Sequence, residues 1–523
     1  MLRHNHHPAT TPYRLRIGAM LIVLLTVMSL RLSTSHAVAQ GNGWSTPVLV
    51  SEPPSSWFSD IVVAPDGAVH IIWSSGKERP GELAGYDLLM HRALLPDGIW
   101  SPINDISNPG FGGFAVRNSI ILGRDGRFHI LLRSAMRVEH ISVLWEQASS
   151  AAAWSPPRRI NSGRNTPYYT ELATDSRGTL HAVWTENTPD DPQQPREKCS
   201  LCSDLYYRHS SDGGDLWSTP INLSQMPQGT DKPQIKIDQR DRIHVAWDEG
   251  LDRNVASDPL WGAYRRSDDG GITWTPVITF SLPTDLIQQT TLGVTGNGNP
   301  IAVYRATASQ TIYYQSSPDG GNTWNAPQPL LGVLARSVNE TLFDGYSTVT
   351  DGAGRVHLFL SGLRASDAQV RVKPLLLHLV WDGRSWSTPE VVIDDGLYPE
   401  WPNAVVDGNT LHLTWFTRSE EDRFISDRAN YQVWYSRETL DGPPVNLLPT
   451  FTPMPTATPW PTPTPIPTTT PWPTFSSGSL PANAQAGQPN LENHALTSLF
   501  LGAAPIIIIA AVVVVVRRVQ DRA

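Results

Sequence analysis

A short apolar strand with a histidine at its second position recurs along the chain roughly every 50 to 60 residues. Residues 69–73 read Val-His-Ile-Ile-Trp, and residues 180–184 read Leu-His-Ala-Val-Trp. The copies begin at Val69, Phe128, Leu180, Ile243, Pro300, Val356 and Leu411. The Pro300 copy lacks the histidine. Because this interval holds four strands and their turns, the repeat predicts an all-β, seven-bladed β-propeller over residues 41–442.

The first and last repeats are incomplete in complementary ways. The chain enters the repeated region with a fourth strand at Trp44 and leaves it with a third strand at residues 431–436. The N-terminal strand can therefore complete the last blade and close the ring. This closure would hydrogen-bond strand edges that otherwise invite aggregation.

Two further segments precede and follow the repeats. Residues 1–39 contain basic residues, an apolar run and the small-residue site Ala37-Val38-Ala39, which is the pattern of a cleaved signal peptide. An uncleaved anchor is the alternative, but the apolar run is short for a membrane span. Residues 443–497 begin with a proline- and threonine-rich tract, which predicts an extended stalk and a disordered linker.

Residues 498–516 are largely apolar and are followed by Arg517 and Arg518. We therefore expect a transmembrane helix with a cytoplasmic tail at residues 517–523. The protein is then a single-pass protein of the cell membrane, with its propeller outside the cell and its C-terminus in the cytoplasm. A sorting signal that is removed for covalent anchoring is the alternative.

Composition argues against several function classes. The net charge of −9 disfavours nucleic-acid binding. No glycine-rich phosphate loop opens a helix, so we expect no cofactor. Cys199 and Cys202 are half a zinc site at most, and in an exported domain they predict a local disulfide. The recurring histidines are expected to pack and to hydrogen-bond between blades, so no metal site is predicted.

Three turns before a fourth strand share the pattern Ser-x-Asp-x-Gly-x-x-Trp. They occupy residues 210–217, 267–274 and 317–324, with Asp212, Asp269 and Asp319 as their aspartates. The pattern resembles the Asp-box, or BNR repeat, of the sialidase-like propellers (the neuraminidase superfamily), and the resemblance covers the propeller. It implies a structural role for the three aspartates, on the face opposite the active site. The carboxylate accepts turn N–H groups, and the glycine permits a positive φ.

Two features depart from that family. Sialidases resemble six-bladed rings, whereas the repeats here number seven. Sialidases also carry an Arg-Ile-Pro motif that supplies a carboxylate-binding arginine, and the matching residues 55–61 contain no arginine. Both departures argue against hydrolysis of sialic acid.

Candidate site residues follow from a comparison of the repeats. Positions at the entry to the inner strands and at the end of the second strands differ between copies, so they are free to form a local site on the top face. Aromatic rings stack on sugars, carboxylates bond hydroxyls, and arginines clasp carboxylates. The predicted ligand-binding residues are Trp57, Arg117, Arg133, Tyr168, Tyr169, Asp231, Arg305, Asp344, Glu400 and Trp401. The candidates for an acid or a nucleophile are Asp60, Tyr169, Glu171, Asp231 and Tyr346. A solvated rim without a ligand is the alternative.

Three functions fit these observations. The first is a membrane-tethered, sialidase-like propeller that binds an extracellular glycan or glycoprotein without sialidase chemistry. The second is an exo-glycosidase, an exo-α-sialidase or a relative, with a rearranged active site. The third is a protein-interaction or adhesion propeller. The expected partners are the glycan and, through the C-terminal helix, the membrane; nucleic acid is not expected, and the oligomeric state stays open.

Overall fold

The computed structural model describes residues 43–53, 55–77, 86–107, 115–162, 166–187, 202–226, 228–251, 259–337, 344–369, 371, 373–419 and 430–445. These residues all belong to one compact unit, residues 1–456. Their helices are two short 3-10 turns, η1 (Trp145–Gln147) and η2 (Ala151–Ala153), and the rest of their regular structure is β-strand. The predicted signal peptide and the segments beyond residue 445 lie outside the described residues.

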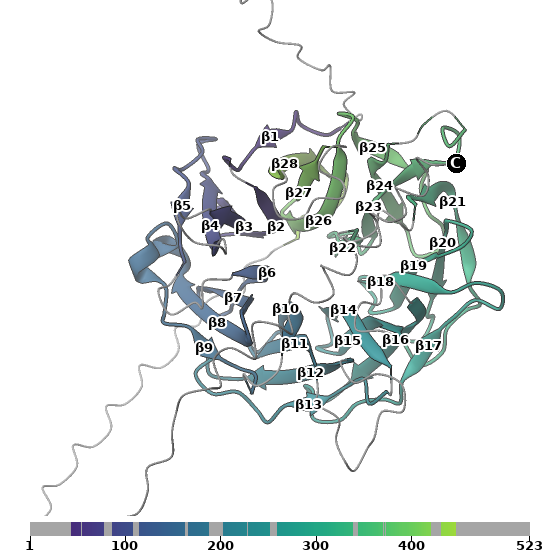
Figure 1. Ribbon diagram of the computed structural model, residues 1–523, viewed down its shortest axis with the longest axis horizontal. Coiled ribbons are helices and arrows are strands. Elements are labelled where there is room, and N and C mark those ends of the chain that lie inside the picture. Colours follow the sequence, from purple (N-terminus) through teal and green to yellow (C-terminus); the bar gives the residue numbers. More distant parts are fainter. Residues whose placement is uncertain are drawn as a thin grey trace, which may run out of the picture. The chain divides into compact units, whose positions relative to one another are not determined.

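Five of the sheets have four strands each (Figure 1). Four of these follow the chain in simple order, as antiparallel meanders. They contain β2 (Ser56–Val63), β3 (Val69–Lys77), β4 (Tyr86–Leu94) and β5 (Asn104–Asp105); β6 (Val116–Leu122), β7 (Arg127–Ser134), β8 (Arg137–Leu144) and β9 (Arg158–Arg159); β10 (Pro167–Thr174), β11 (Leu180–Asn187), β12 (Ser203–Ser210) and β13 (Ile221–Asn222); β14 (Gly229–Ile237), β15 (Ile243–Gly250), β16 (Pro259–Ser267) and β17 (Ile278–Phe280).

The fifth four-stranded sheet closes the ring. It pairs β26 (Tyr398–Asp407), β27 (Thr410–Arg418) and β28 (Gln432–Thr439) with β1 (Val48–Leu49) from the beginning of the chain. Val48 pairs with Tyr435, and Trp44 forms an isolated bridge with Glu438. The predicted closure by the N-terminal strand is therefore present, and it covers the outer edge of β28.

The prediction of seven separate four-stranded blades is wrong. The remaining strands form a single eight-stranded sheet, which follows the β14–β17 sheet along the chain and precedes the closing sheet. It contains β18 (Ile287–Val294), β19 (Pro300–Ala306), β20 (Thr311–Ser316), β21 (Gln328–Ala335), β22 (Ser347–Thr350), β23 (Val356–Arg364), β24 (Leu375–Trp381) and β25 (Glu390–Ile393). The cause is β21, whose last residues turn to pair with β23: Val333 lies opposite Arg364 and Ala335 opposite Gly362.

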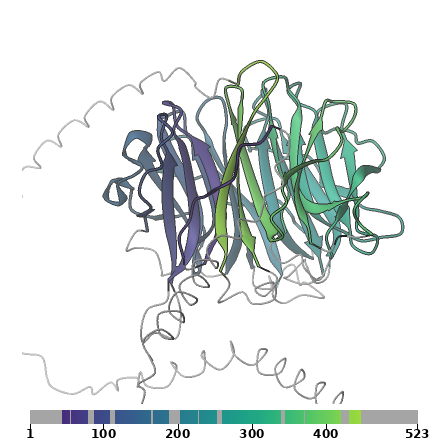
Figure 2. The same cartoon turned by 90° about the horizontal axis from the view of Figure 1, so that it is seen from above.

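The inner strands surround a common centre. Each of β2, β6, β10, β14, β18, β22 and β26 contacts the next, and β26 contacts β2. Figure 1 shows the sheets following one another around this centre, and Figure 2 shows their strands standing side by side. Residues on the inner strands can therefore meet across the ring even when they are far apart in sequence.

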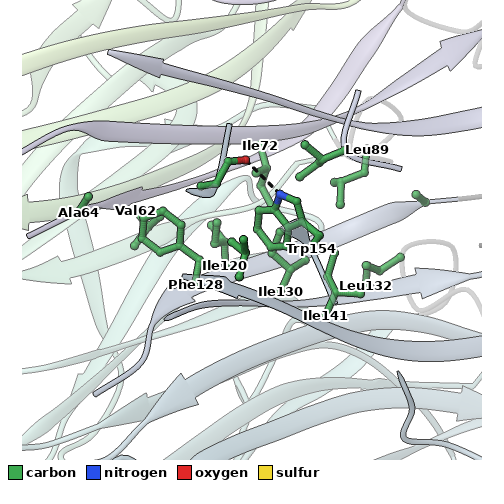
Figure 3. Packing of buried hydrophobic residues seen from close by; sticks show 14 of the residues in the cluster. Val62, Ala64, Ile72, Leu89, Ile120, Phe128, Ile130, Leu132, Ile141 and Trp154 are labelled. Carbon is green, nitrogen blue, oxygen red and sulfur yellow. Dashed lines mark hydrogen bonds between the residues drawn. The ribbon is translucent and has the colours of Figure 1, made fainter. Parts of the chain in front are cut away.

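Apolar cores fill the space between neighbouring sheets. One core packs Ile72 and Leu89 from β3 and β4 against Ile120 and Phe128 from β6 and β7. Figure 3 shows the Trp154 indole within this cluster, where its Nε1 donates to the carbonyl of Ala148 at 3.0 Å. Because the burial is between sheets, each sheet is stabilised by its neighbours rather than by a core of its own.

The recurring histidines are buried, but they bond within their own sheets instead of between blades. Nδ1 of His181 lies 2.7 Å from the hydroxyl of Tyr207 on the next strand. That hydroxyl in turn donates to the carbonyl of Gly270, in the Asp-box of the next sheet. A Cβ at Gly271 would lie only 1.8 Å from the same hydroxyl oxygen, so this box needs glycine there.

The prediction of a single-pass membrane protein is not upheld. None of the helices in the described ranges is long and apolar enough to cross a membrane. The predicted helix at residues 498–516 and its cytoplasmic tail lie outside those ranges. The described residues therefore do not support the expected transmembrane helix or the localisation that was derived from it.

If the N-terminal segment closes the ring, a substitution of its buried residue should destabilise the protein. Trp44 is 2% exposed and packs edge-on against Phe359, whereas Val48 is 38% exposed on the same segment. We expect Trp44→Ala to lower the free energy of unfolding by about 3 to 5 kcal/mol, because it leaves a cavity in the core beside the closing strand. Val48→Ala should change it by less than about 0.5 kcal/mol. Urea denaturation measures both, and equal losses for the two variants would contradict this account of closure.

Candidate functional site

Six inner strands carry a β-bulge near their first residues. In β2 the register shifts between Trp57 and Asp60, and similar shifts occur in β6, β10, β14, β18 and β26. Five residues within these bulges have a positive φ although none is glycine: Phe58, Arg117, Lys232, Gln289 and Trp401. Such a backbone costs on the order of 1 to 3 kcal/mol per residue and clusters at functional sites. The bulges therefore mark this end of the ring.

The Asp-boxes lie at the other end of the strands. In the third sheet Pro167, at the bulged end, pairs with Glu186, whereas Leu180 pairs with Ser210, the first residue of an Asp-box. The box works as its sequence implies: Asp212 accepts N–H of Leu216 at 2.9 Å, and Asp319 accepts N–H of Thr323 at 2.8 Å. The three boxes are thus structural turns, remote from the bulges.

Aromatic rings and a buried arginine meet at the bulged end. The Arg117 guanidinium lies 4.0 Å from the ring centres of both Tyr168 and Tyr169, and 4.7 Å from that of Phe58. The Tyr169 ring stacks on Trp401 at 5.8 Å with an interplanar angle of 8°. Since these residues come from β2, β6, β10 and β26, their side chains meet across the ring. Arg133 lies beside this group, 5.3 Å from the Tyr168 ring.

Buried ion pairs continue this cluster. Glu400 accepts from Arg336 at 2.6 Å and from Arg418 at 2.7 Å, and all three side chains are at most 2% exposed. Arg336 also lies 3.5 Å from the carboxylate of Asp344. Ion pairs with so little access to water hold their geometry well, because breaking one leaves an uncompensated buried charge.

A lysine and three carboxylates occupy the next part of the cluster. Nζ of Lys232 donates to the carbonyl of Asp344 at 3.0 Å. Burial raises the pKa of Asp231 to about 7, although the charges of Lys232 and Arg117 oppose the shift. Burial also raises the pKa of Asp248 against the opposing charge of Lys232, and it lowers the pKa of Lys232 itself. Asp231 is thus a carboxyl that can give or take a proton near neutral pH.

Several buried polar groups here have no hydrogen-bond partner within the described residues. Arg305 is 0% exposed, yet neither Nη1 nor Nη2 has a partner. The side-chain amides of Gln288 and Gln289 and the hydroxyl of Tyr346 are unsatisfied as well. Leaving such groups unpaired costs about 1 to 3 kcal/mol each, and more for a charged group. Unsatisfied groups of this kind call for an explanation, and they make this end of the ring a candidate site.

We call this group the mouth cluster. Its residues are Arg117, Tyr168, Tyr169, Asp231, Lys232, Asp248, Gln288, Gln289, Arg305, Arg336, Asp344, Tyr346, Glu400, Trp401 and Arg418. Its five cationic side chains face four carboxyl groups, and one of these, Asp231, titrates near neutrality. The cluster therefore has a small excess of positive charge, which favours an anionic ligand.

The structure brings all the predicted ligand-binding residues except Trp57 into or beside this cluster, and the acid candidates Asp60 and Glu171 lie outside it. Trp57 packs edge-on against Tyr431 in an apolar core. Asp60 accepts N–H of Ile61 and Ile120, each at 2.8 Å, which is a structural role. Burial raises the pKa of Glu171 to about 8, with the nearby charge of Asp60 adding to the shift and that of Lys236 opposing it.

Sequence comparison missed several members of the cluster. Arg418 lies two residues beyond Phe416, on the same face of β27, so extending the comparison by one alternation would have found it. Asp248 was among the compared positions, but its type alone did not distinguish it. Arg336 follows β21, the strand that joins two repeats, and no repeated pattern marks it.

Two cavities and the cysteines contribute nothing to this site. A cavity of about 540 Å³ is lined by Lys236, Thr348 and turn residues such as Gly352. A second, of about 400 Å³, lies beside Thr295 and Asp382. Neither is lined by any of the unsatisfied groups. Cys202 is buried and disulfide-bonded, and Cys199 lies outside the described residues.

The chain is similar to one protein family and to several solved structures. The family described as "BNR repeat-like domain" matches residues 138–437. Among solved structures, a protein of unknown function from Dyadobacter fermentans is 13% identical, with 76% of this chain and 100% of that chain covered and a TM-score of 0.44. A polysaccharide lyase, an ulvan lyase, is 11% identical, with 80% and 99% covered and a TM-score of 0.49. The NanB sialidase of Streptococcus pneumoniae is 12% identical, with 76% and 71% covered and a TM-score of 0.44. No curated protein matches the chain.

The raised pKa of Asp231 predicts how the stability of the protein depends on pH. Between the ordinary value of 3.8 and about 7, the folded protein binds a proton that the unfolded chain has lost, so stability contributed by this group falls as pH rises through that interval. Asp231→Asn removes the burden of the buried charge. The free energy of unfolding of the variant minus that of the parent should be larger at pH 8 than at pH 5, by at least about 1 kcal/mol. Urea denaturation at both pH values measures this, with the exposed Glu52→Gln as control; an equal difference at the two pH values would contradict it.

Proposed function

The chain belongs to the BNR repeat-like domain family, and from this premise we propose that its sialidase-like propeller binds an acidic carbohydrate at the mouth cluster. The ligand is a sugar that carries a carboxylate, either free or as part of a glycoprotein. The single observation that carries this proposal is the fully buried Arg305 guanidinium with both Nη groups unsatisfied.

The chemistry of these groups supports an acidic sugar over other anions. The two Nη groups of an arginine form a planar fork that matches a carboxylate in two parallel hydrogen bonds. The unsatisfied amides of Gln288 and Gln289 can both donate to and accept from sugar hydroxyls. The Tyr169 and Trp401 rings add apolar faces of the kind that pack on sugar rings.

The environment of Tyr346 favours binding without a tyrosine nucleophile. Burial raises the pKa of this phenol, and the nearby charge of Asp344 adds to the shift. Its hydroxyl has no hydrogen-bonded base within the described residues. An activated nucleophile requires an adjacent base or a lowered pKa, and Tyr346 has neither.

Arg305→Lys tests the binding proposal. The variant keeps the positive charge but loses the planar fork, so we expect the dissociation constant for an acidic glycan to rise at least about tenfold. Isothermal titration calorimetry of the full-length chain with glucuronate- and sialate-containing oligosaccharides, next to their neutral counterparts, measures this. The exposed Arg240, at the Asp-box end, provides the control Arg240→Ala. Wild-type affinity in Arg305→Lys, or equal affinity for neutral sugars, would refute the proposal.

A second candidate function rests on Asp231. A carboxyl with a pKa near 7, close to Tyr169 and the unpaired Nη1 of Arg117, suits a general acid in an exo-glycosidase with a rearranged site. Release of a fluorogenic aglycone from a panel of acidic and neutral glycosides tests it. If the protein is such an enzyme, Asp231→Asn should lower turnover by at least about a hundredfold while binding persists. No turnover of any glycoside by the parent protein would leave binding as the function.

A further inference from the structure

Three metal-ligating side chains meet beside the strand that closes the ring. They are His378 on β24, Glu390 on β25 and Glu438 on β28, and one ligand atom from each lies within 4.8 Å of the others. Nδ1 of His378 is 3.4 Å from Oε2 of Glu390 and 3.6 Å from Oε2 of Glu438. His378 is 4% exposed. This group lies at the Asp-box end of the strands, away from the mouth cluster, since Glu438 pairs with Leu411 and Glu400 pairs with Phe416.

The hydrogen bonds on the far side of His378 determine which of its nitrogens carries a proton. Asp351 can only accept, and its Oδ2 lies 3.2 Å from Nε2 of His357, so that Nε2 carries the hydrogen. Nδ1 of His357 is then an acceptor, and it lies 2.9 Å from Nε2 of His378. Nε2 of His378 therefore donates, which leaves its Nδ1 as an unprotonated acceptor in the neutral ring.

When both carboxyl groups are ionised, three acceptors face one another. The Nδ1 lone pair points at two carboxylates, and Oε2 of Glu438 has no hydrogen-bond partner in the described part of the chain. Electrostatic repulsion among them is strong in a buried site unless a positive charge lies between them.

We propose that His378, Glu390 and Glu438 bind a divalent cation of the zinc class. An imidazole nitrogen with two carboxylate oxygens is a ligand set that zinc takes at about 2.0 to 2.2 Å. Two ligands at that distance in tetrahedral geometry lie roughly 3.4 Å apart, close to the two distances measured from Nδ1 of His378. Calcium prefers six to eight oxygens and fits less well.

The surroundings hold the imidazole in place for this role. Phe359 stacks on its face at 4.8 Å, and Trp44 meets it edge-on at 5.6 Å. Hydrogen bonds link His378 to His357 and His357 to Asp351. Hydrogen bonds behind a metal-bound histidine of this kind fix the orientation of its ring. Because Glu438 also forms the bridge with Trp44, a cation here would fasten β28 to its neighbours at the point of closure.

Two other sheets contain the same histidine pair without the carboxylates. Nε2 of His91 lies 2.9 Å from Nδ1 of His70, and Nε2 of His140 lies 3.0 Å from Nδ1 of His129. In the strand register His91 faces Asn104, His140 faces Arg158, and His378 faces Glu390. The scaffold is thus repeated, and the third copy alone among these pairs places a carboxylate opposite the histidine.

The test uses the full-length chain, stripped with EDTA and then titrated with zinc chloride. We expect binding of one zinc per chain by calorimetry and elemental analysis, and a rise of a few degrees in the melting temperature. Calcium chloride should produce neither effect. Glu390→Gln and Glu438→Gln should each weaken zinc binding at least tenfold, while His91→Gln, which changes an equivalent pair, should leave it unchanged.

The same experiment shows whether a variant loses zinc binding because it is misfolded. Glu438→Gln removes one of the repelling carboxylates, so in EDTA its melting temperature should equal or exceed that of the parent, and only its response to zinc should be lost. Zinc binding that persists in both glutamine variants would overturn the proposal. The proposal would also be overturned if the parent protein bound no zinc and its melting temperature changed with pH but not with zinc, since a proton would then occupy the site.

Discussion

Backbone hydrogen bonds between β1 and β28 hold the ring of sheets closed, and the arrangement of the inner strands depends on them. The apolar cores lie between sheets, so an unclosed ring would leave one sheet without a neighbour and one strand edge without a partner. Closure also sets the distances across the centre. Tyr169 on β10 and Trp401 on β26 are 232 residues apart in sequence, and they stack because the ring joins their strands.

The mouth cluster is costly for the fold. Four of its residues other than glycine adopt a left-handed backbone, and Arg305 and two glutamines leave buried polar groups unsatisfied. Such a set persists only where the surrounding structure enforces it, and the interstrand bonds from Lys232 and Gln234 to the segment at Asp344 and Tyr346 do so. The strained backbone and the unsatisfied groups of Arg305, Gln288 and Gln289 support the proposal that a ligand binds at this end of the ring.

Much of this organisation follows from the sequence because repeated residues report on the scaffold. The recurring strand of each repeat, the closing role of the Trp44 segment and the Asp-box turns are all of this kind. The seven separate blades were mispredicted because β21 continues past its own repeat and pairs with β23. The alternation of apolar and polar residues along β21 would be the same if the strand ended before that pairing. Arg117, Asp231 and Trp401 were found as variable positions at a shared end. Arg336 could not be found, because it lies where the repeat itself breaks down.

Comparison of repeats also explains why the histidine cluster escaped sequence analysis. A residue that recurs in every sheet is correctly interpreted as packing, and His357 and its counterparts do pack. The distinguishing residue is the partner across the strand pair: Asn104, Arg158 or Glu390. A positive Arg158 would repel a cation from His140, a neutral Asn104 offers His91 little, and Glu390 attracts one to His378. The invariant pair supplies the geometry, and one variable position decides its chemistry, which is also how the bulged ends of the inner strands acquire different functional groups on a common backbone.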